Sequence, residues 1–261
     1  MRFLVTGHKG FIGSHIYSEF SNKYEVYGYD IGDSFLDAKF DVIVHMAARG
    51  LIRKSIEMPY DYFQDDLALV LKFLEIARKD DSIFIFPSSG STAEPTNPYS
   101  LSKKQAEEWI KLYGKLYGLQ YYILRFFNIY GDGSRKGAVY LFTKAALFDE
   151  EAVVYGDGSH IRDFLYVGDV PRTIERLLNE KYRRGEYEVG SGKGTSVNDL
   201  ISLIEHITGK RLKVRHENYI LPEAEKLIAL NTVVKDPTPL DAGIKKVIEF
   251  IRSDSKNDVR K

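Results

Sequence analysis

A tyrosine and a lysine four residues apart form the pair whose spacing most directly suggests chemistry in this sequence. Tyr99 and Lys103 begin and end the segment Tyr-Ser-Leu-Ser-Lys, and residues at positions i and i+4 of a helix share one face. Half-ionising a tyrosine near pH 7 requires lowering its pKa by about three, or about 4 kcal/mol. One ammonium group together with a cationic cofactor ring can supply that. The pair therefore predicts a tyrosine that takes up and returns a proton.

Two serines, Ser88 and Ser89, follow an apolar run over residues 82–86 that is typical of a buried strand. A hydroxyl at a strand end can hydrogen-bond a substrate alcohol or carbonyl and relay its proton to Tyr99. The structural alternative is a strand-end turn or a helix cap. No Gly-x-Ser-x-Gly elbow or Ser-His-Asp pattern surrounds these serines, so a hydrolase of that kind is not indicated.

Three glycines at Gly-x-x-Gly-x-x-Gly spacing separate a strand-like run from a helical segment. Gly7, Gly10 and Gly13 would allow a tight turn, a close approach to a pyrophosphate and close packing of helix on strand. The helix N-terminus offers free N–H groups and the positive end of the helix dipole to phosphates. A purely structural turn is the alternative, but the flanking elements favour a dinucleotide site.

Asp30 ends the next strand-like run, Tyr-Gly-Tyr-Asp. A carboxylate there can accept both hydroxyls of an adenosine ribose and would repel a 2′-phosphate, which favours NAD over NADP. Lys9, inside the glycine turn, indicates the opposite, because a cation near the ribose could hold a 2′-phosphate. We give Asp30 the greater weight and expect NAD as the cofactor.

Short apolar runs alternate with helical segments through the first part of the chain. The runs cover residues 2–6, 24–29, 41–45, 82–86 and 121–126, and the helical segments cover residues 11–20, 60–79 and 99–117. This alternation predicts parallel strands with helices on both faces. The expected fold class is α/β, a Rossmann-type doubly wound parallel sheet.

After about residue 127 the pattern becomes irregular, with Gly-Asp-Gly at 131–133 and again at 156–158. We expect residues 1–127, with returning segments near 160–190, to form an NAD-binding domain. Residues 128–252 should form a smaller irregular α/β lobe that binds substrate at the carboxyl ends of the strands. A last helix is expected over residues 238–252 and a polar tail over residues 253–261.

Composition excludes several classes of protein. The chain has 37 basic and 37 acidic residues, which argues against a protein that coats nucleic acid. It has no cysteine, which excludes thiolate catalysis and cysteine-bound zinc. No apolar run could span a membrane and no signal-peptide layout is present, so we expect a soluble, cytoplasmic protein. His45 has no second ligand at metal spacing, so we expect a structural histidine and no metal.

Together these segments resemble the extended short-chain dehydrogenase/reductases, in the group of NAD-dependent sugar-nucleotide epimerases and dehydratases. Among them the UDP-glucose 4-epimerases are the most similar. The matching segments cover most of residues 1–200 in the family's order: TGHKGFIGSH at 6–15, HMAA at 45–48, RKSIEMP at 53–59, FPSSGS at 86–91, NPYSLSK at 97–103, LRFFNIYG at 124–131, YGDGSHIRDFLYVGDV at 155–170 and YEVGSGKGTSVNDL at 187–200.

The resemblance implies roles for individual residues. Ser89, Tyr99 and Lys103 match the catalytic triad, Tyr99 and Lys103 also match cofactor contacts, and Ser89 a substrate contact. Asn128 and Arg162 match positions that contact the diphosphate of the substrate; the alternatives are a turn residue and a surface arginine. The remaining cofactor positions are Gly7, Gly10, Phe11, Ile12, Gly13, Asp30, Met46, Ala47 and Ala48.

Three departures from the family pattern bear on function. Dehydratases of the group carry an acidic residue after the catalytic hydroxyl, where Gly90 and Ser91 stand here, so a 4,6-elimination is disfavoured. The segments over residues 30–41 and 89–99 are shortened. Leu221 stands where the family usually places an arginine that grips the diphosphate.

The resemblance implies an NAD-dependent 4-epimerase of a UDP- or other nucleoside-diphosphate hexose, acting through a transient 4-keto sugar. Two alternatives stay open: an NAD(P)-dependent reductase or dehydrogenase of a keto-sugar or other alcohol, and a dinucleotide-binding protein without catalysis. The apolar stripe around Trp109 is similar to part of the family's dimer interface. We therefore expect a homodimer through the helices near residues 60–79 and 99–117, with no nucleic-acid or membrane partner.

Overall fold

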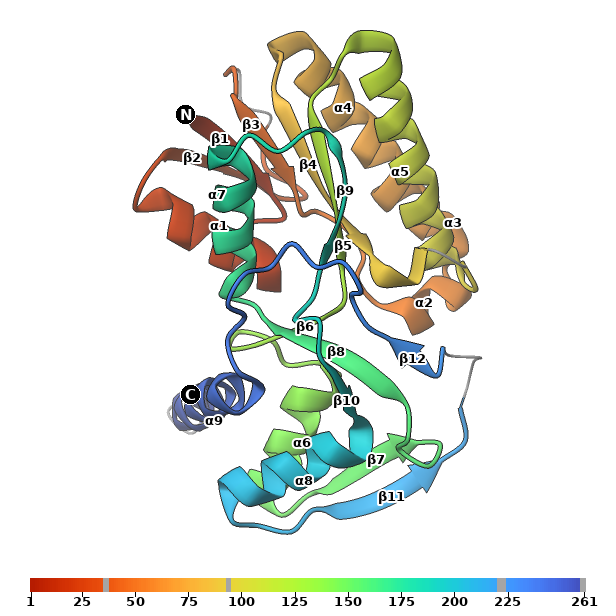
Figure 1. Cartoon of the computed structure of the whole chain (residues 1–261), viewed down its shortest axis with the longest axis vertical. Coiled ribbons are helices and arrows are strands. Elements are labelled where there is room, and N and C mark those ends of the chain that lie inside the picture. The colour runs from red at the N-terminus through yellow and green to blue at the C-terminus, as the bar shows by residue number, and fades with distance from the viewer. Residues whose placement is uncertain (35–37, 93–94, 220–223, 259–261) are drawn as a thin grey trace. The chain divides into compact units, whose positions relative to one another are not determined.

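A computed structural model describes residues 1–34, 38–92, 95–219 and 224–258 of the chain. These residues group into two compact units (Figure 1). Unit 1 comprises Met1–Phe126 and Val170–Glu188, and unit 2 comprises Phe127–Asp169 and Val189–Lys261. The chain therefore leaves unit 1 after Phe126, returns to it at Val170 and leaves it again after Glu188.

Unit 1 is built on a six-stranded sheet with the order β2-β1-β3-β4-β5-β9. β1 pairs in parallel with β2 and β3, and β4 pairs in parallel with β3 and β5. The strands are β1 (Arg2–Thr6), β2 (Glu25–Tyr29), β3 (Val42–His45), β4 (Ile83–Ser89), β5 (Tyr121–Phe126) and β9 (Gly185–Val189). The order reverses at β1 and β3, and such a switch point is where doubly wound sheets bind ligands, at the carboxyl ends of the strands. The expected fold class is confirmed.

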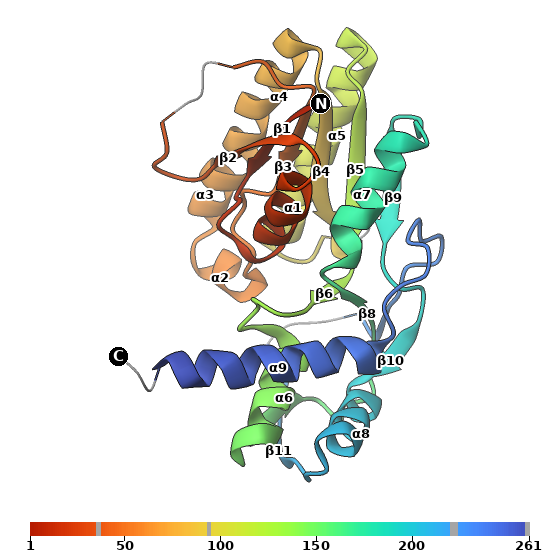
Figure 2. The same ribbon diagram turned by 90° about the vertical axis from the view of Figure 1, so that its left-hand side faces the viewer.

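Helices cover both faces of this sheet, with α1 and α7 on one face and α4 and α5 on the other (Figures 1 and 2). Their apolar sides bury large side chains such as Phe20, Phe73 and Ile110, all fully buried. The helical elements of unit 1 are α1 (Phe11–Ser21), α2 (Ile52–Glu57), α3 (Pro59–Tyr62), η1 (Phe63–Ala68), α4 (Leu69–Asp80), η2 (Gly90–Thr92), α5 (Pro98–Tyr117) and α7 (Asp169–Asn179).

The described residues of unit 2 form two small sheets and three helices. β8 (Ile161–Tyr166) pairs in parallel with β6 (Asn128–Tyr130) and β12 (Lys226–Leu227), and antiparallel with β10 (Gly194–Ser196). β7 (Glu151–Tyr155) pairs in parallel with β11 (Lys213–Glu217). The helices are α6 (Gly137–Phe148), α8 (Val197–Thr208) and α9 (Leu240–Asp258).

Three elements differ from the sequence-based expectation. β4 continues through Ser88 and Ser89, so these serines end the strand rather than follow it. The helix expected over residues 60–79 contains a turn of π-helix, η1. α9 continues to Asp258, so most of the expected polar tail is helical. An ion pair between Arg135 Nη2 and Asp254 Oδ1 at 2.7 Å supports that last part of α9.

None of the helices in the described part of the chain is both long enough and apolar enough to cross a membrane.

Candidate active site

The glycine turn adopts a conformation that requires glycine. Gly7 has φ +66°, and a Cβ atom on it would lie 2.7 Å from the backbone nitrogen of Ala47. A Cβ atom on Gly13 would lie 2.1 Å from the Gly7 carbonyl oxygen. α1 then begins at Phe11 without a side-chain cap at Gly10. Its first backbone N–H groups therefore have no partner within the helix and can bind a ligand beside the turn. The turn thus brings β1, β3 and α1 as close together as a dinucleotide site requires.

A pocket of about 220 Å³ opens beside this turn within unit 1. Six of its lining residues are predicted cofactor positions: Gly7, Gly10, Asp30, Met46, Ala47 and Ala48. Ile31, Arg49, Asp65 and Leu69 also line it and were missed from the sequence, since their types carry no cofactor signal. Phe11, Ile12 and Gly13 instead form the first turn of α1.

Asp30 directly follows β2, and its carboxylate is held by backbone N–H groups. Oδ1 accepts from the Ile31 nitrogen at 3.0 Å and Oδ2 from the Lys9 nitrogen at 3.2 Å. Each carboxylate oxygen has a second lone pair. The carboxylate can therefore still accept hydroxyl groups at the pocket.

Tyr99 and Lys103 are placed by the start of α5. Asn97 and Ser100 form a capping box, and Pro98 occupies the first helical turn, where its missing N–H has no cost. The Lys103 side chain is 4% exposed, and its Nζ donates to the Pro87 carbonyl at 2.9 Å. Its ammonium lies 6.0 Å from the centre of the Tyr99 ring. The two predicted residues are therefore on one helix face, and Lys103 links α5 to β4.

Burial, together with the charges of Asp66 and Tyr62, raises the pKa of Tyr99 to about 12. The nearby Ser89 hydroxyl works against this rise. The expectation that Lys103 lowers the pKa of Tyr99 is not met in this structure. Desolvation is the main influence on the pKa of Tyr99. The Lys103 ammonium is held by the Pro87 carbonyl, and burial also lowers the pKa of Lys103 itself.

Ser89 ends β4, and its hydroxyl is close enough to Tyr99 to influence the pKa of that phenol. Its Oγ lies 2.9 Å from the Ser91 Oγ and accepts from the Ser91 backbone nitrogen at 3.2 Å. Ser91 belongs to η2, the short turn that follows β4. Two hydroxyl groups and one phenol therefore lie together at the carboxyl end of β4.

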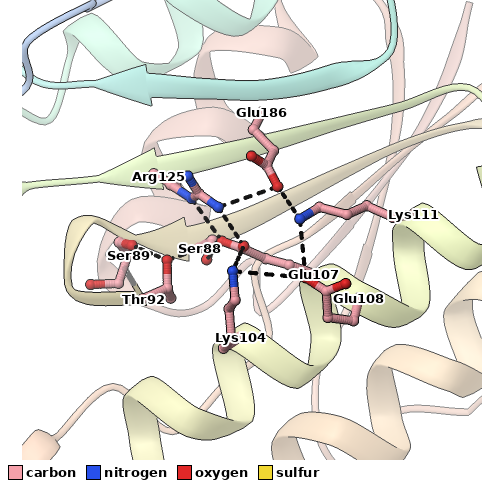
Figure 3. Close-up of polar contacts among 9 residues, drawn as sticks. All are labelled: Ser88, Ser89, Thr92, Lys104, Glu107, Glu108, Lys111, Arg125 and Glu186. Atoms are coloured by element: carbon pink, nitrogen blue, oxygen red, sulfur yellow. Dashed lines mark hydrogen bonds and ion pairs between the residues drawn. The ribbon is translucent and has the colours of Figure 1, made fainter. Parts of the chain in front are cut away.

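A buried carboxylate, Glu107 of α5, anchors the end of β4 through hydrogen bonds (Figure 3). It is fully buried and accepts from Ser88 Oγ at 2.6 Å and from Arg125 Nε and Nη2 at 3.0 and 2.7 Å. The Thr92 hydroxyl lies 3.1 Å from Glu107 Oε1 and 2.8 Å from the Ser89 carbonyl oxygen. Neighbouring strand residues face opposite sides, so anchoring Ser88 fixes the direction of Ser89. Sequence analysis did not single out Glu107.

Asp66, in η1, is a second carboxylate that sequence analysis missed. It is 4% exposed, its Oδ1 accepts from the Arg49 nitrogen at 2.7 Å, and its Oδ2 has no hydrogen-bond partner among the described residues. Burial raises its pKa, while Lys103 acts against that rise. Turns of π-helix occur often at functional sites, but η1 has no signature that a reading of the sequence could detect.

His45 is a structural residue, as expected. Its Nδ1 lies 3.0 Å from Thr6 Oγ1, and its ring stacks among Phe73, Phe84 and Phe86. Burial lowers its pKa to about 3, so the imidazole is neutral. Over residues 1–34, 38–92, 95–219 and 224–258 there is no group of three potential ligands that could hold a metal ion.

The two predicted substrate residues lie on neighbouring strands of unit 2. Asn128 is in β6 and Arg162 in β8. The Arg162 Nη1 donates to the carbonyls of Ala224 at 2.9 Å and Ile161 at 3.1 Å. Asn128 Nδ2 donates to the Asp163 carbonyl at 3.3 Å. Leu221 lies outside the described residues.

The site has the parts of a dinucleotide-dependent enzyme of the Rossmann type, and comparison with known proteins specifies the class further. Residues 3–190 match the NAD dependent epimerase/dehydratase family. The chain belongs to this family.

Relatives extend this similarity over the full chain. A Methanocaldococcus jannaschii protein named as a candidate UDP-glucose 4-epimerase is 31% identical over 97% of this chain and 99% of its own. That alignment spans 304 positions, more than the 261 residues present here, so the relative contains segments that this chain lacks.

Two solved structures are also similar. The UDP-glucose 4-epimerase of Thermotoga maritima with UDP-glucose is 28% identical, covers 98% of this chain and 100% of its own, and has a TM-score of 0.88. The Thermus thermophilus UDP-glucose 4-epimerase complex with NAD is 25% identical, covers 97% and 99%, and has a TM-score of 0.86. The expected family is therefore confirmed.

Proposed function

We propose that this protein is an NAD-dependent 4-epimerase of nucleoside-diphosphate hexoses. The observation that carries the proposal is that Tyr99 and Lys103 share one face of α5, with Lys103 Nζ bonded to β4 beside the strand end that carries Ser89. The names of the relatives support it, because one similar structure holds UDP-glucose and another holds NAD. A UDP-hexose is the substrate that we expect.

The residues around the glycine turn fit the cofactor. A Cβ atom at Gly7 would collide with the Ala47 backbone, so glycine keeps this wall of the pocket open to a pyrophosphate. The uncapped start of α1 would bind the phosphates, and Asp30 would accept the ribose hydroxyls. When bound, NAD supplies the acceptor and then the donor of the hydride that leaves and returns to C4 of the sugar.

Tyr99 carries the proton in both half-reactions. As phenolate it takes the proton of the C4 hydroxyl while the hydride leaves, and as phenol it returns that proton to the C4 oxygen when the hydride comes back. With a pKa of about 12 in this structure, the residue is a phenol at neutral pH. The Ser89 hydroxyl acts to lower this pKa, and positive charge on a bound nicotinamide ring acts in the same direction. Lys103 orients the ribose and keeps α5 fixed on β4.

Arg162 and Asn128 are the side chains that we assign to the diphosphate. A guanidinium is always charged and matches phosphate oxygens in pairs. In this structure, backbone carbonyls of Ala224 and Ile161 fix the Arg162 guanidinium. Phosphate binding would therefore cost little side-chain ordering.

The proposal is tested by product analysis. Purified protein with NAD should convert UDP-glucose to UDP-galactose, or another UDP-hexose to its C4 epimer, without net formation of NADH. The variant Tyr99→Phe should lose at least about 100-fold in kcat. Tyr117→Phe, which changes an exposed tyrosine of the same helix, is the matched control and should keep full activity. Full activity of Tyr99→Phe on every substrate of the wild type would sink the proposal. Stoichiometric NADH would favour the oxidoreductase alternative.

We also propose a homodimer formed by one face of unit 1. α5 exposes Leu101, Trp109, Leu112 and Leu116, which recur at helical spacing. Phe63, in η1, is 51% exposed beside it. Apolar side chains gathered on one helix face favour association with a second copy of the chain.

A further inference from the structure

Lys9, the cation within the glycine turn, is bound by a carboxylate other than Asp30. Its Nζ lies 2.9 Å from Asp33 Oδ1 and 3.2 Å from Asp33 Oδ2. Asp33 Oδ2 also accepts from the Asp30 backbone nitrogen at 2.8 Å. One carboxylate therefore ties the end of the Lys9 side chain to the backbone of the residue that faces the ribose.

The backbone of Lys9 makes a second link, because its nitrogen donates to Asp30 Oδ2 at 3.2 Å. Lys9 thus supports Asp30 through its N–H while its ammonium is directed to Asp33. The hydrogen bond from the Lys9 ammonium, followed by that from the Asp30 nitrogen, holds the pKa of the Asp33 carboxyl below its usual value. Asp33 is consequently charged at neutral pH and can neutralise the lysine.

The charges near the ribose position decide between the two cofactors. An unpaired ammonium beside Asp30 would attract a 2′-phosphate and oppose the selection that Asp30 makes. A bidentate contact with a second carboxylate removes that attraction. It also adds a negative charge that repels the 2′-phosphate.

We propose that Asp33 is a cofactor-specificity residue, which excludes NADP by holding the Lys9 ammonium away from the position of a 2′-phosphate. This inference rests on the proposed function, in which the pocket beside Asp30 binds the adenosine ribose. It explains how a lysine can lie in the glycine turn of an NAD-dependent protein. Lys9 then serves the turn through its backbone and its pairing with Asp33.

The test is direct binding of NADH and NADPH, measured by fluorescence titration of the purified proteins. Asp33→Asn keeps the size of the side chain but removes its charge. It should raise the affinity for NADPH relative to NADH by about two- to fivefold, the range that one exposed ion pair contributes. Asp41→Asn removes an exposed carboxylate at the other end of β1, outside the pocket, and should leave the ratio unchanged.

The double variant Lys9→Met/Asp33→Asn isolates the role of the lysine. It should lose most of the gain in NADPH affinity that Asp33→Asn shows. The proposal is overturned if Asp33→Asn leaves the ratio of affinities unchanged or if the full gain persists without Lys9.

The single variant Lys9→Met tests the inference without changing Asp33. It should discriminate against NADPH as strongly as the wild type does, whereas a selective loss of NADPH binding would show that the lysine already reaches the 2′-phosphate. A wild type that binds neither nucleotide would instead refute the proposed function, because the specificity of Asp33 concerns only the choice between them.

Discussion

Glu107 should be the most costly charged residue of unit 1 to remove. The change Glu107→Ala takes one partner from a buried ion pair, which costs about 3–5 kcal/mol. Arg125 would keep Glu186 at 3.2 Å, and its side chain is 23% exposed, so we expect the lower end, about 3 kcal/mol. For a chain of this size, that loss lowers Tm by about 6–12 °C.

Thermal unfolding followed by circular dichroism measures this loss, with two further variants as references. Glu107→Gln keeps an acceptor for Ser88 but not the charge, and should lose about 1–2 kcal/mol. Glu108→Ala changes the neighbouring glutamate, which is 61% exposed and pairs with Lys104 and Lys111. It should cost no more than about 0.5 kcal/mol.

The pH dependence gives an independent check on the sign. Burial would raise the pKa of Glu107, but the hydrogen bonds of Arg125, Ser88 and Thr92 outweigh it and leave the pKa below the usual 4.5. A carboxyl whose pKa is lower in the folded state contributes stability above its unfolded pKa and loses it as pH falls through the folded pKa. The difference between wild type and Glu107→Gln should therefore shrink below about pH 4.5. Equal stability of Glu107→Ala and Glu108→Ala at neutral pH would show that the buried Glu107 contributes no more than an exposed glutamate does.

Three other variants test separate parts of the site. Asp66→Asn keeps the acceptor for the Arg49 nitrogen but removes a charge that raises the pKa of Tyr99. The part of the kcat/KM profile that rises with pH should therefore move to lower pH. An unchanged profile would show that Asp66 does not influence Tyr99. Gly7→Ala should abolish NADH binding, because its Cβ would lie 2.7 Å from the Ala47 nitrogen; binding at wild-type affinity in a fluorescence titration would contradict this. Leu112→Glu with Leu116→Glu should give monomers in sedimentation, where the wild type forms dimers; a wild-type monomer at micromolar concentration would disprove the dimer.

The elements of unit 1 could be predicted because their signals are local. The apolar runs at residues 2–6 and 121–126 coincide with β1 and β5. The glycine spacing likewise predicted the turn, since only glycine fits at Gly7 and Gly13. A strand, a glycine turn and a helix follow one another within a few residues, so this arrangement can be predicted from the local sequence alone.

The parts of the site that were missed depend on residues far apart in the chain. The role of Glu107 is recognisable only once β5 brings Arg125 to it. β9 then brings Glu186 to the same arginine. Asp66 gains its environment from η1, a deviation from α-helix that leaves the apolar periodicity almost unchanged. Burial of this kind is a property of the packed fold and not of a local pattern.

The same reason explains the wrong expectation about the pKa of Tyr99. Helical spacing correctly placed Lys103 on the same face, but it gave no account of the desolvation of both residues. The Pro87 carbonyl, which belongs to β4, accepts a hydrogen bond from the Lys103 ammonium. The effect of Lys103 on Tyr99 is thus set by tertiary contacts rather than by the i, i+4 spacing.

In the proposed reaction, a hydride leaves C4 of the substrate and returns to the same carbon within one protein molecule. The most direct measurement uses a UDP-hexose deuterated at C4, with the epimeric product isolated and its label located by NMR or mass spectrometry. We expect the product to retain deuterium at C4 and no labelled NADH to be released. Loss of deuterium to solvent, or its accumulation in free cofactor, would show that the hydride does not return to C4 of the same sugar.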